Sequence, residues 1–180
     1  MLEIVVPAKE FLIGRRFINT KTTRLRLEHS LVSISKWEQT WKKPFINVGP
    51  ANAEETIDYI RCMTITQNVD PMVYQALTPD NIKQVNDYIA DPATASKFYD
   101  NELAKLQKKT NPKKETMTSE KLYALMTQYR INWAAEKWHL NRLIAVIEYC
   151  NQMNTPPRKL NAQERAAINR ANRMKYKSKG

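Results

Sequence analysis

The amino-acid sequence predicts an α+β fold that is mainly α, with an N-terminal β-hairpin or small sheet, a helical bundle and a basic C-terminal helix. Three observations predict it. Apolar and polar side chains alternate near the N-terminus, which is typical of strands. Further along, apolar residues recur three and four positions apart, which indicates roughly four to six amphipathic helices. The chain has 180 residues, of which 42% are hydrophobic, so one domain can bury a core.

The first segment, residues 1–50, begins with two predicted strands. Residues 2–6 (LEIVV) are short, apolar and largely β-branched. Apolar and polar side chains alternate along residues 23–29 (TRLRLEH), so Leu25 lies on the same side of the strand as the other apolar residues. A turn around Gly14 would fold the two strands into a hairpin or small sheet.

A short helix is predicted to follow within residues 33–45 (SISKWEQTWKKPF). Ser35 followed by Glu38 matches a capping box, in which each residue satisfies a free amide of the other. Pro44 is expected to end the helix, since the residue before a proline disfavours helical geometry.

Two tryptophans of this helix and two adjacent lysines form the first candidate site. Trp37 and Trp41 are four residues apart and would share one helix face. They would either anchor the helix against the sheet or, with Lys42 and Lys43, form a cation-rich edge that could meet an acidic partner. Both interpretations stay open from the sequence.

The second segment, residues 51–104, is acidic and helical in pattern. Capping residues and prolines predict helix starts at Asn52, Pro71 and Thr78. The third of these helices is expected to end at Asp91, before Pro92. A further helix is expected over residues 95–106.

A basic connector, residues 105–117, separates this segment from a two-helix segment, residues 118–155. Thr118 is expected to cap the first helix, and the second is predicted to run from residue 132 to residue 152. One face of this long helix is apolar, with Trp133 and Cys150 extending the stripe. The core of the stripe consists of Leu140, Leu143, Ile144 and Ile147.

The opposite face of the long helix is the second candidate site. Trp138, Arg142 and Tyr149 cluster there at helical spacing. A helix with two such faces is either central to a bundle or covered by a partner. Aromatic stripes are usually core, whereas Trp, Tyr and Arg are also the residue types enriched in interface hot spots. The sequence leaves both interpretations open.

The third candidate site is the C-terminal arm, residues 156–180, which is expected to form an exposed basic helix. The formal net charge of the chain is +11, and the last thirty residues carry eight basic residues and one acidic residue. Such an arm can bind phosphate backbones, remain solvated, or become ordered on a protein partner. Its candidate contact residues are Arg165, Arg170, Arg173, Lys175 and Lys177.

Motif analysis argues against most enzyme classes, so we expect no enzyme, no metal and no cofactor. The cysteines and histidines, two of each, show no pair at the spacing of a zinc ligand set. Gly14 and Gly49 stand alone, so no glycine-rich phosphate loop exists, and no catalytic signature occurs. No apolar run is long enough to span a membrane.

Three segments together resemble small proteins of long-tailed, siphovirus-type bacteriophages, the tail assembly chaperone family. They are residues 25–45 (LRLEHSLVSISKWEQTWKKPF), residues 57–77 (IDYIRCMTITQNVDPMVYQAL) and residues 136–180, which begin EKWHLNRLIAVIEYCNQMNTPPRKL. The resemblance spans most of the chain.

The resemblance implies a non-enzymatic assembly factor that acts in the cytoplasm of the bacterial host. Tail assembly chaperones coat the tape measure protein and help to recruit tail tube subunits around it. They are typically absent from the mature virion, and many are made in two lengths by frameshifting. Self-association is a further possible property. A structural component of the virion and a basic nucleic-acid-binding accessory protein are the alternative functions.

Overall fold

The computed structural model describes residues 1–95 and 116–154 of the chain. The chain divides into two compact units, Met1–Tyr149 and Cys150–Gly180. Of the second unit, only the end of the last helix is described. Three sequence predictions therefore lie outside the described residues: the helix over residues 95–106, the basic connector up to residue 115, and the C-terminal arm with its five candidate contact residues.

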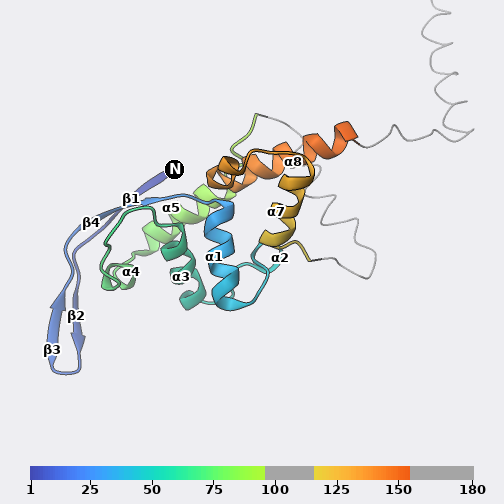
Figure 1. Cartoon of the computed structure of the whole chain (residues 1–180). Coiled ribbons are helices and arrows are strands. Elements are labelled where there is room, and N and C mark those ends of the chain that lie inside the picture. The colour runs from blue at the N-terminus through green and yellow to red at the C-terminus, as the bar shows by residue number, and fades with distance from the viewer. Residues whose placement is uncertain (96–115, 155–180) are drawn as a thin grey trace, which may run out of the picture. The chain divides into compact units, whose positions relative to one another are not determined.

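The described elements confirm the α+β, mainly α, fold class, with the strands first and the helices after them (Figure 1). In chain order they are β1 (Leu2–Val6), β2 (Glu10–Ile13), β3 (Arg16–Asn19), β4 (Thr23–Leu27), α1 (Leu31–Trp41), α2 (Phe45–Val48), α3 (Ala53–Met63), α4 (Met72–Gln75), α5 (Pro79–Ala90), α7 (Ser119–Gln128), the 3₁₀ helix η1 (Trp133–Lys137) and α8 (Leu140–Asn154).

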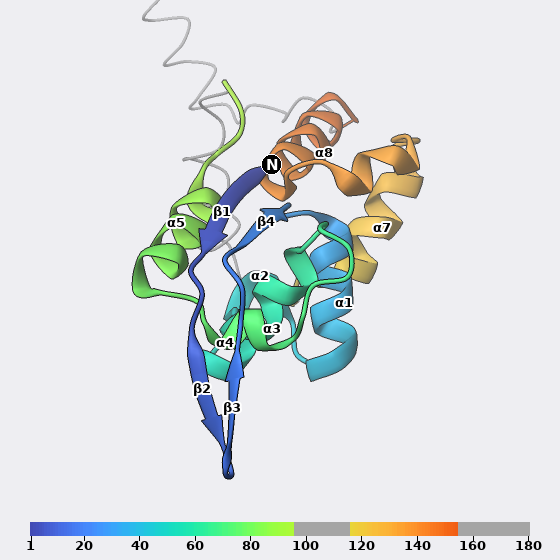
Figure 2. The same ribbon diagram turned by 90° about the vertical axis from the view of Figure 1, so that its left-hand side faces the viewer.

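The four strands form one long antiparallel hairpin in two parts, an inner pair and an outer pair. The inner pair is β1 with β4, and the outer pair is β2 with β3. At the junction between them, the Thr20 N–H donates to the carbonyl of Lys9, and the Lys9 N–H donates to the Thr20 hydroxyl, both at 2.9 Å. The outer pair extends away from the helices of its unit (Figures 1 and 2). The predicted turn around Gly14 is confirmed.

The inner pair supplies one wall of the hydrophobic core. Ile4, Val6, Leu25 and Leu27 point toward the helices and are buried, while the alternate residues of both strands face outward. α1, α3 and α5 pack on this side, and residues of α7 and α8 belong to the same core. The alternation that predicted these strands thus reflects one covered face and one exposed face.

The N-cap of helix α1 lies five residues before the predicted cap at Ser35, so this expectation was wrong. Ser30 is the N-cap, and Ser33 completes a capping box with it. Leu31 and Ile34 are fully buried, so starting the helix at Ser30 adds apolar residues to its packed face. Ser35 lies inside the helix. The helix ends at Trp41, just before Pro44 as expected.

The helix starts predicted in the acidic segment are confirmed. The Asn52 side chain accepts a hydrogen bond from the Glu55 N–H at 2.8 Å, which caps α3. Thr78 caps α5, whose first residue is Pro79. Proline fits this position because the first helical amide has no intrahelical acceptor. The short helix α4 follows Pro71.

The long helix predicted from residue 132 to residue 152 is divided in two, which corrects the sequence interpretation. η1 ends at Lys137, Trp138 is extended, and α8 starts at Leu140. The break is caused by a tertiary contact. The Leu140 N–H donates to the carbonyl of His29 at 2.7 Å, and Ser30 and His139 form a β-bridge. Those backbone groups are therefore unavailable for a continuous helix.

A buried carboxylate joins α1 to two other parts of the fold. Glu38 Oε1 accepts the Phe45 N–H and Glu38 Oε2 accepts the Ser119 N–H, each at 2.8 Å. Thr118 occupies the N-cap position of α7 as predicted, but its side chain makes no capping hydrogen bond. Glu38 from α1 supplies an acceptor at this helix start instead, where negative charge is favourable.

Candidate functional site

The structure assigns the two candidate tryptophans of α1 to different environments. Trp37 is fully buried, and its indole N–H donates to the backbone carbonyl of Glu55 at 3.0 Å. Its ring packs edge-on against Phe45. Trp37 is therefore a core residue that joins α1 to α3, and its proposed role as a partner-contact residue is corrected. Trp37 instead anchors its helix, which is the alternative interpretation that the sequence left open.

Trp41, one turn later, lies at the surface end of the same helix face. Its indole N–H donates to Asp58 Oδ2 at 2.9 Å, and Asp58 also accepts from the guanidinium of Arg61. Lys43 Nζ lies 5.7 Å from the Trp41 ring centroid. Trp41 thus keeps a partly exposed ring in a polar setting, as interface aromatic residues often do.

The cation-rich edge expected at Lys42 and Lys43 is smaller than the sequence suggests. Lys43 Nζ forms an ion pair with the buried carboxylate of Glu55 at 2.7 Å. The hydrogen bonds from Lys43 and from the Ala51 N–H hold the pKa of Glu55 below its ordinary value. Lys43 therefore neutralises a charge of its own chain. Lys42 is exposed, and its backbone is left-handed where it ends α1.

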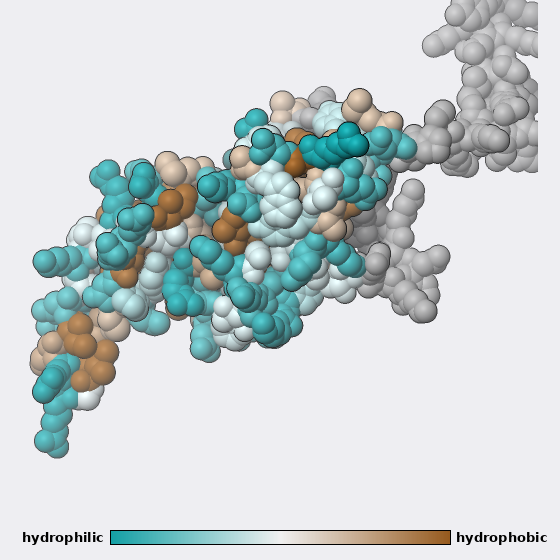
Figure 3. Space-filling view, in the orientation of Figure 1, coloured by the Kyte–Doolittle hydropathy of each residue, from teal (hydrophilic) through white to brown (hydrophobic). Residues whose placement is uncertain are grey.

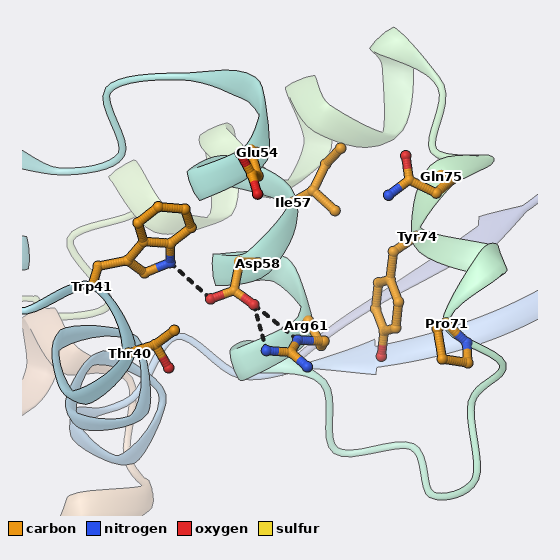
Figure 4. Close-up of a pocket in the computed structure, with 9 residues that line it drawn as sticks. All are labelled: Thr40, Trp41, Glu54, Ile57, Asp58, Arg61, Pro71, Tyr74 and Gln75. Atoms are coloured by element: carbon orange, nitrogen blue, oxygen red, sulfur yellow. Dashed lines mark hydrogen bonds and ion pairs between the residues drawn. The ribbon is translucent and has the colours of Figure 1, made fainter.

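A shallow groove opens beside Trp41, between α1, α3 and the start of α4 (Figure 4). Its volume is about 480 Å³. Trp41, Ile57 and Tyr74 provide apolar walls, while Glu54 and Asp58 from α3 supply carboxylates at the rim. Thr40, Arg61, Pro71 and Gln75 complete the lining. The groove can take an apolar side chain that carries a cationic neighbour.

The second candidate site is partly assembled. Arg142 lies on α8 with its guanidinium carbon 4.9 Å from the ring centroid of Trp138, a cation–π contact. Tyr149 lies two turns further along α8 on the face of Arg142. Trp138 and Tyr149 are 39% and 40% exposed. Trp138 belongs to the extended break before α8, so its expected helical alignment with Tyr149 is wrong, although its contact with Arg142 is present.

A stacked aromatic pair in η1 and α7, with one exposed member and one half-buried member, was missed from the sequence. Trp133, which was expected to extend the buried stripe, is 57% exposed. Its ring stacks on Tyr123 with centroids 5.4 Å apart and an interplanar angle of 20°. The stripe prediction failed because η1 is not continuous with α8. The sequence contains no direct signal for that break.

A buried polar cluster brings together both histidines of the chain, although they are 110 residues apart in sequence. The His29 and His139 ring centroids are 5.2 Å apart, and His29 Nδ1 hydrogen-bonds to the Tyr59 hydroxyl. Burial, together with the nearby His139, lowers the pKa of His29 to about 3. Burial raises the pKa of Tyr59 far above its ordinary value. Both groups are therefore neutral, which suits a structural junction.

The described residues contain neither of two other kinds of site, a metal cluster and a membrane-spanning helix. No group of three or more His, Cys, Asp or Glu side chains in residues 1–95 and 116–154 is placed to hold a metal ion. Among the same residues, no helix combines the length and the apolar character that crossing a membrane requires. What these parts of the chain do offer is exposed aromatic and apolar surface.

Comparison of the chain with protein-family models, with curated proteins and with solved structures finds no match.

Proposed function

We propose that the chain is a non-enzymatic tail assembly chaperone of a long-tailed bacteriophage. In this role it binds the tape measure protein and recruits tail tube subunits during tail assembly in the host cytoplasm, and it is absent from the mature virion. The observation that carries the proposal is the resemblance of residues 25–45, 57–77 and 136–180 to that family.

The arrangement of these segments adds support from geometry. The first segment contains the His29 carbonyl, and the third contains the Leu140 N–H that donates to it. The second segment contains Met63, whose carbonyl accepts the Glu28 N–H. The three resembling segments therefore meet at one junction of the fold, where α5 joins them through Tyr88, whose hydroxyl donates to Glu28 and whose carbonyl hydrogen-bonds to His139.

The surface of the framework suits the binding of a long client helix. Amphipathic helices dock through apolar anchors at helical spacing, and Trp, Tyr and Arg dominate such contacts. Trp138 with Arg142, and Tyr149 beyond them, provide these residue types on an exposed surface. We assign the client contact to these three residues.

Co-expression with the tape measure protein of the same phage tests the proposal. We expect the chain to keep the tape measure protein soluble and to elute with it as one complex. The double variant Trp138→Ala, Tyr149→Ala should lose co-elution, whereas Val48→Ala, which alters another exposed apolar residue, should retain it. An insoluble tape measure protein with no complex would show that the chain is not its chaperone.

Two further measurements separate the alternative functions. Mass spectrometry of purified virions should not detect the chain, and its presence in stoichiometric amount would instead identify a structural component. Nucleic-acid binding that falls steeply with salt, and that is lost when residues 158–180 are deleted, would favour the accessory-protein alternative.

A further inference from the structure

The outer hairpin pair, β2 with β3, is apolar on both of its faces. Opposed residues of an antiparallel pair lie on the same face, and faces alternate along the strand. Leu12 pairs with Phe17 on one face, whereas Phe11 pairs with Ile18 on the other. Leu12 and Phe17 are 63% and 68% exposed. Figure 3 shows hydrophobic side chains gathered near the end of this hairpin.

Packing within one copy of the chain gives this two-stranded ribbon little stability. β2 and β3 form a sheet of two strands, and no third strand pairs with either within the described residues. Phe11 packs against the core, but Leu12 and Phe17 on the other face are open, and a two-stranded ribbon with so little packing is marginally stable in water. Contiguous exposed apolar side chains of this kind mark binding surfaces. The outer pair therefore has the properties of an element that is covered by a partner.

The charge around the outer pair defines what partner surface would fit. Residues 9–24 carry five basic residues and one acidic residue, a net charge of +4. Arg15 and Arg16 at the turn are both exposed. A surface that accepts this hairpin needs an apolar recess with carboxylates around it, because charge complementarity steers association and excludes wrong partners.

The same chain carries a surface of that kind. Residues 51–91 hold seven acidic and two basic residues, a net charge of −5. The groove of about 480 Å³ lies between this region and α1, is walled by Trp41, Ile57 and Tyr74, and has Glu54, Asp58 and Arg61 as its charged lining residues. Glu54 at its rim is exposed and forms no ion pair with any described residue. The groove lining contains no residue of the hairpin, and no other described part of the chain fills the groove.

We propose that the outer hairpin of one copy docks into the Trp41–Tyr74 groove of a second copy. Phe17 and Leu12 enter the apolar recess, and the turn arginines face the exposed carboxylate of Glu54 at its rim. Each copy offers one hairpin and one groove, so the contact either closes reciprocally in a dimer or continues from copy to copy. This self-association is independent of the tape measure protein.

Sedimentation velocity of the full chain tests the proposal at protein concentrations from about 1 to about 200 µM, where small interfaces associate. We expect reversible association that weakens as salt is raised, since the charges involved are exposed. Phe17→Ser and Glu54→Lys should each raise the dissociation constant at least about tenfold. Val48→Ser should leave it unchanged, and circular dichroism should show that all three variants are folded.

A mixing experiment then separates hairpin-to-groove docking from other contacts. Phe17→Ser retains an intact groove, and Glu54→Lys retains an intact hairpin. An equimolar mixture should therefore form heterodimers at concentrations where each variant alone stays largely monomeric. Two results would overturn the proposal: a wild-type chain that stays monomeric over the whole concentration range, or a Glu54→Lys variant that associates as strongly as the wild type.

Discussion

The inner and outer pairs of the hairpin belong to one continuous ribbon but have opposite environments. In β1 and β4, apolar residues alternate with polar ones, and Ile4 and Leu25 are buried under the helices. In β2 and β3, apolar residues are adjacent in sequence, and nearly all side chains are exposed. The difference shows that alternation indicates one covered face. Its loss places apolar side chains on both faces, and Leu12, Ile13 and Phe17 stay more than half exposed.

Truncation of matched leucines should give the largest difference between the two pairs. Leu25→Ala, in the inner pair, should reduce the free energy of unfolding by about 3–5 kcal/mol, because it removes buried methyl groups and leaves a cavity. Leu12→Ala, in the outer pair, should change it by less than about 0.5 kcal/mol. Urea unfolding followed by tryptophan fluorescence measures both. Equal losses would mean that the outer pair is also packed.

Removal of a carboxylate should give the next largest contrast. Glu38→Ala leaves the buried Phe45 and Ser119 amides without an acceptor, and should reduce the free energy of unfolding by about 2–4 kcal/mol. Glu10→Ala, on the exposed outer pair, should have an effect within about 0.5 kcal/mol. Thermal unfolding monitored by circular dichroism provides the comparison. A small effect of Glu38→Ala would show that water replaces the carboxylate.

Acid should destabilise the buried cluster around His29, next to the inner pair, and leave the outer pair unaffected. The folded-state pKa of His29 is about 3, far below the value of about 6.5 in an unfolded chain. The unfolded state therefore binds more protons below pH 6.5, and stability is lost as the pH falls. From pH 7.5 to pH 5.5 we expect a loss of about 1.4 kcal/mol in urea unfolding.

The pH dependence can be assigned by two variants. His29→Gln should flatten the slope between pH 7.5 and pH 5.5, although the variant is less stable overall. Leu12→Ala should keep the slope of the wild type, since β2 and β3 contain no histidine. If the slope persists in His29→Gln, a titratable group other than His29 is responsible.

The turn of the outer pair should give the smallest global effect. Gly14 has a φ of +63°, a left-handed conformation that Ala adopts less readily. Gly14→Ala should accelerate amide hydrogen exchange in β2 and β3 while exchange in β1 and β4 stays unchanged, because the two pairs open separately. The free energy of global unfolding should change by less than about 0.5 kcal/mol. Faster exchange in all four strands would show that the ribbon opens as one unit.

Local signals in the sequence were sufficient for most of the secondary structure. Asn52, Thr78 and Pro79 mark helix starts because capping and proline geometry depend on neighbouring residues only. The start of α1 was misplaced because Ser30 and Ser35 both qualify as caps. The buried positions of Leu31 and Ile34, which favour Ser30, depend on the tertiary fold.

The break before α8 and the roles of the tryptophans were not accessible from local patterns. No glycine or proline separates Trp133 from Leu140, and the interruption results from hydrogen bonding to a segment about 110 residues earlier. Trp37 and Trp41 share a helix face, but only the first lies fully under α3. Periodicity identifies a face of a helix, whereas burial also depends on how far the neighbouring element extends.

The pairing of Leu140 with His29 also has a consequence for how the chain folds during synthesis. The N-terminal strands and α1 are translated early, but the residues that complete the junction at His29 and Ser30 are translated more than a hundred residues later. Contacts so distant in sequence close slowly, because a long loop must be ordered before they form. A nascent chain therefore lacks these contacts at the Ser30 end of α1 until most of the protein has left the ribosome, and a truncated chain ending before residue 139 never makes them.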